Sequence, residues 1–140
     1  MAQTPPDAAL AALVGEYDSC WGQLDFEELS RLWVRADPEP VYVGDEYAEP
    51  LVGAEELDRH WARLSARVSE ASMSSTLHRA DVLDGGVVRC VLLCRWRLVA
   101  RGVGGAGEGA SWVTWLAVPR DGRYLIALHT ESEVHLAADG

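Results

Sequence analysis

The strongest constraint on the fold is a pair of β-rich segments near the end of the chain, joined by a short turn. The first runs from Ser111 to Val118, the second from Tyr124 to Ser132, and Pro119–Arg123 lies between them. Proline, aspartate and glycine between two alternating apolar segments are typical of a β-hairpin. Polar residues recur within both segments: Thr114, His129 and Glu131. We expect these side chains to face either water or a pocket.

A long strand is predicted ahead of this hairpin, over residues 87–101, after a strand over residues 74–83 and a turn at Asp84–Gly86. Alternate residues of a strand point to opposite faces of the sheet. One face of the long strand carries Cys90, Leu92, Cys94, Trp96 and Leu98. The other carries three arginines among apolar residues: Arg89, Val91, Leu93, Arg95, Arg97 and Val99. We therefore expect helices to cover one face and a second copy of the chain to cover the other.

Helices are predicted at the start of the chain, where apolar residues recur every three or four positions. The first helix follows Pro5–Asp7, and Gly22 ends it. The second begins at Asp25, which can cap its first turn together with Glu28. The prolines within residues 37–40 then stop this helix, because proline cannot continue one.

The chain continues through a short strand over residues 41–43 and a polar loop or ragged hairpin over residues 45–50. Gly53 opens a third helix over residues 54–69, which ends where the strand pattern begins. This order of elements predicts a single α+β domain over residues 1–140, with an ordered core over residues 7–136 or about that range.

The charge of the chain excludes several classes of partner. Its formal net charge is −10, so it lacks the clustered positive charge with which proteins neutralise nucleic acids or anionic membranes. No apolar run approaches the roughly 20 residues of a membrane-spanning helix, and the first residues do not resemble a signal peptide. We therefore expect a cytoplasmic protein that binds neither nucleic acid nor membrane.

Two motifs suggest a cofactor or a metal, but their contexts argue against both. Gly102–Gly107 matches the dinucleotide-binding pattern G-x-G-x-x-G, yet a strand and not a helix follows it. We predict a hairpin loop there. The histidines show no metal-binding spacing, and the chain supplies no cysteine cluster for zinc; the residues concerned are His60, His78, His129, His135, Cys20, Cys90 and Cys94. We expect no cofactor, no metal, and cysteines that are buried small apolar residues.

His129 and Tyr17 are the polar residues with the clearest chemical potential. His129 lies in an apolar strand, two residues before Glu131 on the same strand face. A neighbouring carboxylate can orient an imidazole and stabilise its charged form, although a core or interface histidine with a single hydrogen bond fits the same pattern. Tyr17 is in line with Trp21 on the first helix. Its hydroxyl either completes a core hydrogen bond or donates to a developing oxyanion.

Four segments, in this order and spacing, resemble the SnoaL-like branch of the NTF2-like superfamily. The resemblance covers most of the chain, from about Leu10 to Ser132. It rests on the aromatic-rich opening helix pair with Tyr17, Trp21 and Trp33, the Leu-Val-Gly start of the third helix, the long strand, and the closing Asp-Gly-Arg-Tyr strand. These segments are residues 17–33, 51–61, 82–99 and 120–132.

The resemblance implies a cone of three N-terminal helices packed on a curved, mostly antiparallel sheet, with an apolar pocket. Such proteins are mostly homodimers, which implies a dimer through the outer sheet face. Tyr17 matches the oxyanion tyrosine of the ketosteroid isomerases in this superfamily, and Asp45 is a near match to their general-base aspartate. Thr114 stands where their second oxyanion acid is expected, which argues against steroid isomerisation.

We expect a small-molecule-binding protein, and as its activity an acid–base reaction of the cyclase, isomerase or dehydratase type on a hydrophobic or polycyclic ligand. The predicted catalytic residues are His129 as acid and base, Glu131 orienting it, Tyr17 and Asp45. The predicted ligand-binding residues are Trp21, Trp33, Trp61, Trp112 and Thr114.

Two alternatives stay open. The chain lacks an intact catalytic set of the family, which also fits a non-catalytic homodimeric module for ligand binding or association. Arg95 and Arg97, if they point inward, suit instead a carboxylate ligand or an acid–arginine pair of the epoxide hydrolase type.

Overall fold

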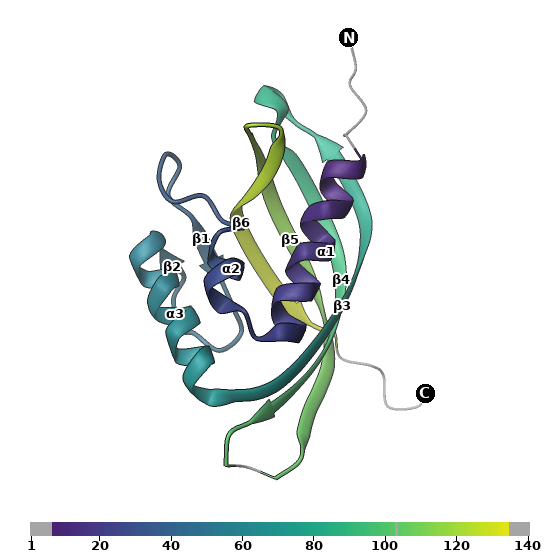
Figure 1. Cartoon of the computed structure of the whole chain (residues 1–140). Helices are drawn as coiled ribbons and strands as arrows, with labels where there is room; N and C mark the ends of the chain where they lie inside the picture. The colour runs from purple at the N-terminus through teal and green to yellow at the C-terminus, as the bar shows by residue number, and fades with distance from the viewer. Residues whose placement is uncertain (1–6, 103, 135–140) are drawn as a thin grey trace.

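The computed structural model describes residues 7–102 and 104–134. It forms an α+β cone in which three helices pack against a curved, six-stranded sheet (Figure 1). The elements are α1 (Asp7–Gln23), α2 (Phe26–Ser30), β1 (Val41–Val43), β2 (Leu51–Val52), α3 (Ala54–Arg67), β3 (Val68–Val82), η1 (Asp84–Gly86), β4 (Val88–Ala100), β5 (Ala106–Arg120) and β6 (Arg123–Glu133). The predicted fold class is therefore confirmed.

The strands follow the order β2-β1-β6-β5-β4-β3 across the sheet. All neighbouring pairs are antiparallel except β1 and β6, which are parallel. The predicted closing hairpin is β5–β6, and its turn residues Asp121 and Gly122 have positive φ angles of 51° and 82°. This conformation matches a two-residue turn of the primed type, whose twist suits a hairpin. The loop predicted within Gly102–Gly107 connects β4, which ends at Ala100, to β5, which already begins at Ala106; residue 103 lies outside the described residues.

Strand β3 is longer than predicted, because it begins at Val68 and not at Ser74. The third helix ends at Arg67, and Val68 already has extended geometry. Residues 70–73 read as helix or loop in isolation, but they pair with β4, where Met73 lies opposite Trp96. Ala71 and Met73 also pack against the core. This long-range pairing outweighs the weak local preference of the segment.

A one-residue bulge in β6 decides which residues of its second half face the helices. The pairing with β5 shifts from Leu116–Leu128 to Ala117–Ile126, which leaves Ala127 as an extra residue. Strand residues alternate between faces, so an extra residue exchanges the faces for everything that follows it. Ile126 therefore points inward before the bulge, and His129 points inward after it; both are fully buried.

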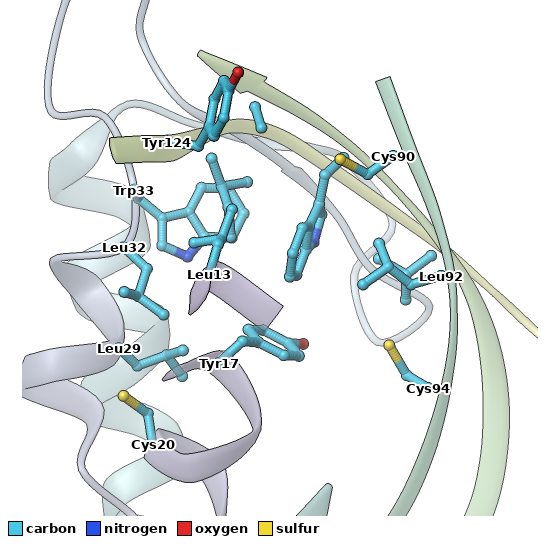
Figure 2. Close-up of a cluster of buried hydrophobic side chains, with 14 of the residues drawn as sticks. Leu13, Tyr17, Cys20, Leu29, Leu32, Trp33, Cys90, Leu92, Cys94 and Tyr124 are labelled. Atoms are coloured by element: carbon cyan, nitrogen blue, oxygen red, sulfur yellow. The ribbon is translucent and has the colours of Figure 1, made fainter. Parts of the chain in front are cut away.

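The helices cover the inner face of the sheet and form one continuous core. Figure 2 shows Leu13 and Tyr17 of α1 and Leu29, Leu32 and Trp33 from around α2 opposite Cys90, Leu92 and Cys94 of β4. The three cysteines are free and buried, as predicted. Burial raises the thiol pKa of Cys90 and Cys94 to about 11, so both stay protonated at neutral pH.

The two faces of β4 differ in this single chain. Val88, Cys90, Leu92 and Cys94 are buried under the helices, whereas Val91, Leu93 and Val99 are only partly covered. Arg95 and Arg97 lie on that outer face and are exposed. Placing these arginines in the interior is therefore wrong, because their strand positions alternate with the buried residues. No helix of the described residues is long and apolar enough to cross a membrane.

We predict that Leu92→Ala lowers the free energy of unfolding by about 2–5 kcal/mol, because it leaves a cavity in the middle of the core. Leu83 in the turn after β3 is 39% exposed, so Leu83→Ala serves as the matched control and should change the free energy by less than about 0.5 kcal/mol. Urea unfolding of both variants measures the difference. Equal losses would contradict the assignment of the inner face.

Candidate functional site

The site is built around His129, a buried histidine on the inner face of β6. In the sheet it lies opposite Trp115 of β5 on one side and Tyr42 of β1 on the other. The indole Nε1–H of Trp115 donates a hydrogen bond of 3.0 Å to His129 Nδ1. An indole N–H can only donate, so Nδ1 is the accepting nitrogen and the proton of the neutral ring sits on Nε2. The sheet register thus fixes the tautomer of His129.

Glu131 accepts a hydrogen bond from the second ring nitrogen of His129. His129 Nε2 lies 2.8 Å from Glu131 Oε1, to which it donates. Burial raises the pKa of this carboxyl, but the hydrogen bonds from His129, from the backbone N–H of Asp45 and from the Tyr42 hydroxyl outweigh it, and the net pKa is lowered. Glu131 is therefore an ionised carboxylate at neutral pH. Its side chain is 19% exposed.

Tyr42 connects two histidines through its ring and two carboxylates through its hydroxyl. Its ring stacks on His129 with a centroid distance of 4.8 Å and lies 4.6 Å from His60 of α3. The hydroxyl lies 2.8 Å from Glu46 Oε1 and 3.3 Å from Glu131 Oε1. Burial, followed by the charges of Glu131 and Glu46, raises the pKa of Tyr42 well above its usual value. The hydroxyl therefore remains a proton donor between the two acids.

His60 is also buried, and its tautomer is fixed by Tyr47 and Arg63. Arg63 donates to the hydroxyl oxygen of Tyr47 through Nη2 at 2.7 Å and Nε at 3.1 Å. The hydroxyl in turn lies 2.7 Å from His60 Nδ1. Since the arginine occupies the oxygen as an acceptor, the hydroxyl donates to Nδ1 and the ring proton sits on Nε2. Burial, with a smaller effect of Arg63, lowers the pKa of His60 to about 4, so the ring is neutral at pH 7.

Tyr17 of α1 reaches the same interior from the helix side. Its ring makes an edge contact with Trp115 at 5.0 Å and lies 6.5 Å from His129. Burial, together with the nearby Cys94 and Glu131, raises the pKa of Tyr17 well above 10. The hydroxyl is therefore protonated across the physiological range and can serve only as a neutral hydrogen-bonding group.

The structure brings some of the sequence-predicted site residues together and separates others. His129, Glu131 and Tyr17 lie in the interior, as do three of the predicted tryptophans: Trp21, Trp33 and Trp61. Asp45 is exposed, and it takes part through its backbone N–H to Glu131.

Trp112 and Thr114 do not lie in the interior. Both are on the outer face of β5, where Trp112 is 40% exposed and contacts His78. The reason is strand alternation: Ser111, Val113 and Trp115 are the inward residues of this strand. Trp115 therefore takes the inward position that was predicted for Trp112.

Sequence reasoning missed three residues of the site: Trp115, Tyr42 and His60. Trp115 could have been found by assigning Ser111 and Val113 to the inner face, because Trp115 lies on the same strand face as these two residues. His60 lies at the edge of the apolar face of its helix, a weak signal for burial. Tyr42 carries no local signal, because only the pairing of β1 with β6 places it beside His129.

Side chains of the described residues pack against one another in the interior of the cone, and two surface hollows lie outside it. One, of about 550 Å³, is lined by Glu27, Ser30, Arg31, Trp33, Arg35, Asp58 and Leu125. The other, of about 250 Å³, is lined by Phe26, Glu27, Ser30, Asp58, Trp61, Ala62 and Ser65. Within residues 7–102 and 104–134, no three histidine, cysteine or acidic side chains come together in a way that could hold a metal ion.

Comparison with solved structures places this architecture among known folds. The chain is similar to a ketosteroid isomerase-like protein from Erwinia carotovora atroseptica, with a TM-score of 0.77, 14% identity and coverage of 92% of this chain and 96% of that one. It is also similar to a proposed scytalone dehydratase from Novosphingobium aromaticivorans, with a TM-score of 0.79, 13% identity and coverage of 92% of this chain and 84% of that one. A third similar structure is a proposed dehydratase of the NTF2-like family from Streptomyces avermitilis, with a TM-score of 0.73, 18% identity and coverage of 94% of this chain and 100% of that one.

These similarities define the class of structure: the chain has the NTF2-like α+β cone, so the resemblance predicted from the sequence is confirmed at the level of the fold. No protein-family model matches the sequence, and no curated protein matches it. The reaction and the ligand therefore have to be argued from the site itself.

We predict that His60 makes the protein less stable as the pH falls. An unfolded histidine binds a proton near pH 6.5, whereas folded His60 does so only near pH 4. Between these values the unfolded state binds more protons, so stability falls as the pH falls, by about 3 kcal/mol in all. Urea unfolding measures the free energy of unfolding at pH 7 and at pH 4. Between these pH values, His60→Gln should lose less of this free energy than the wild type, by about 3 kcal/mol. The exposed control His78→Gln should lose as much as the wild type.

Proposed function

We propose that this protein is an acid–base enzyme that acts on a small, flat, largely apolar carbonyl compound inside the cone. The observation that carries the proposal is the buried His129–Glu131 pair, whose protonation state is fixed by Trp115. Buried polar groups of this kind cost stability unless they are fully paired. A buried carboxylate that is hydrogen-bonded to a neutral histidine in an aromatic core is therefore a feature typical of functional sites.

The geometry favours Glu131 as the group that exchanges a proton with the ligand. Both ring nitrogens of His129 are already engaged, one by the Trp115 N–H and one by Glu131. The carboxylate of Glu131 is partly exposed and can accept a proton from an activated carbon. His129 then acts as a positioning residue, the reverse of the roles predicted from the sequence.

The surrounding side chains support a reaction through an enolate. A carboxylate whose pKa is lowered is a weak base, so the negative charge that develops on the substrate oxygen must be stabilised. The hydroxyl groups of Tyr17 and Tyr42 both remain protonated near Glu131. The rings of Trp33, Trp61 and Trp115 offer apolar surfaces for a planar ligand. These features fit isomerases, dehydratases and cyclases, and the names of the structural neighbours include a ketosteroid isomerase-like protein and a proposed scytalone dehydratase.

A second candidate function is a non-catalytic module for ligand binding or association. The observation in its favour is that the protein's own side chains fill the cone, so a ligand has to displace some of them. This module would bind a ketone without exchanging its protons. We further propose that the protein acts in the cytoplasm as a homodimer, with the outer sheet face as the interface.

The enzymatic proposal predicts that the wild type catalyses exchange of the α-hydrogens of an aromatic ketone such as 1-tetralone in D2O. Glu131→Gln should slow this exchange by about 100- to 10,000-fold, the usual contribution of a general base. Glu133 lies two residues further along and is exposed, so Glu133→Gln is the matched control and should leave the rate unchanged. Proton NMR measures both rates. Binding of the ketone without exchange in the wild type would favour the second function.

The dimer proposal predicts a mass in solution of twice the 15.3 kDa chain. Trp112→Glu places a charge on the outer face, where a second chain would bury it at high cost, and should shift the protein toward the monomer. Light scattering at micromolar concentration measures the mass. A wild-type mass of one chain would exclude this interface.

A further inference from the structure

We propose that the buried N–H groups of His60, Trp61 and Trp33 form a binding site for a neutral carbonyl compound. The proposal rests on the proposed function of the cone as a small-molecule site and names the chemical class of the ligand. It is motivated by side-chain N–H groups that lie in the interior without acceptors.

The two tryptophans carry buried donors that are not used by the described residues. The Nε1–H groups of Trp33 and Trp61 are inaccessible to solvent and have no hydrogen-bond partner. An indole N–H cannot act as an acceptor, and leaving a buried donor unpaired costs about 1–3 kcal/mol. The N–H of Trp115, by contrast, donates a hydrogen bond to His129. The unpaired state is thus a property of particular tryptophans and not of the core as a whole.

His60 contributes a third donor of the same kind. The hydroxyl of Tyr47 donates to its Nδ1, which places the proton on Nε2. This Nε2–H is buried and also has no hydrogen-bond partner within residues 7–102 and 104–134. A neutral imidazole with a fixed N–H can polarise a carbonyl group without being protonated.

The three rings form one contiguous group. His60 and Trp61 have ring centroids 4.7 Å apart, and Trp61 and Trp33 are 6.1 Å apart. Tyr42 contacts each of them and carries its hydroxyl to Glu131. A ligand held at these donors would therefore lie close to the proposed base. The third unpaired indole among the described residues, that of Trp21, contacts Phe26 and is not part of this group.

The charges around this site select a neutral acceptor over an anion. Glu46 Oε1 lies 3.9 Å from His60 Nε2, beyond hydrogen-bond distance but close enough to repel a negative ligand. Glu131 is the second carboxylate nearby, and it is ionised at neutral pH. The cation on this side, Arg63, is bound to the Tyr47 hydroxyl. A ketone or quinone oxygen fits these conditions, whereas a carboxylate does not.

Both tryptophans can be reached from the surface. Trp33 lines the larger hollow and Trp61 the smaller one, and the two hollows share Glu27, Ser30 and Asp58. Both tryptophans therefore border the groove between α2 and α3, and their indole N–H groups are inaccessible to solvent. The ion pair between Arg35 and Asp58 lies at this groove. Its side chains are half exposed, so opening it costs only about 1 kcal/mol or less.

The test is a titration of the intact protein with 1-tetralone, followed through the indole N–H signals in ¹H–¹⁵N NMR spectra. We expect the signals of Trp33 and Trp61 to move to lower field as they gain an acceptor, and those of Trp115 and Trp112 to stay near their free positions. Tetralin, which has the same carbon skeleton and no oxygen, should not produce this shift. The anion 1-naphthoate should bind at least about 10-fold more weakly than the ketone.

Trp61→Phe keeps an aromatic ring and removes the donor, and it should weaken binding of 1-tetralone by about 2- to 10-fold, the range of one neutral hydrogen bond. Trp112→Phe is the matched control and should leave binding unchanged. The proposal is overturned if the ketone leaves the Trp33 and Trp61 signals in place, or if naphthoate binds as tightly. These readouts do not involve proton exchange, so loss of exchange in Glu131→Gln with unmoved indole signals would uphold the proposed function and refute this site alone.

Discussion

The hydrogen bond from Trp115 to His129 is the interaction on which the rest of the interior depends. Without an indole N–H on Nδ1, the buried imidazole could carry its proton on either nitrogen, and the contact with Glu131 would not be assured. With it, Nε2 must donate to Glu131, and the carboxylate in turn remains ionised. Tyr42 and Glu46 continue the same network outward. A single cross-strand contact therefore sets the charge pattern across the centre of the cone.

Local patterns in the sequence were sufficient for the elements but not for the inner surface of the sheet. Proline, glycine and apolar periodicity located the hairpin, the long strand and the three helices, since these features depend on neighbouring residues. The residues of β5 assigned to the inner face were wrong by one position, so Trp112 and Thr114 were predicted as site residues in place of Trp115. Alternation gives two equivalent solutions for a strand with apolar residues on both faces, and only the packing of the helices decides between them.

The site itself was predictable only in part. His129, Glu131 and Tyr17 were found because each lies in an element whose apolar face contains it. Tyr42 comes from a three-residue strand and joins the site through the pairing of β1 with β6. His60 comes from the edge of a helix and joins the site through its contact with Tyr42. The bulge at Ala127 shows the same limit, because no turn residue marks it, and yet it turns His129 and Glu131 inward.

The parallel pairing of β1 with β6 has a consequence for how the site comes into being. Tyr42 meets His129 only when residues 41–43 reach the last strand of the sheet, across most of the chain. Contacts between residues so far apart in sequence are slow to form, because the entropy of closing the intervening loop is lost before the contact stabilises it. The short β1–β2 edge is also held by few backbone bonds, and such edges open first in the native state. The aromatic stack over His129 therefore depends on this edge, and detachment of β1 and β2 would remove Tyr42 from the histidine while the hairpin that carries His129 stays folded.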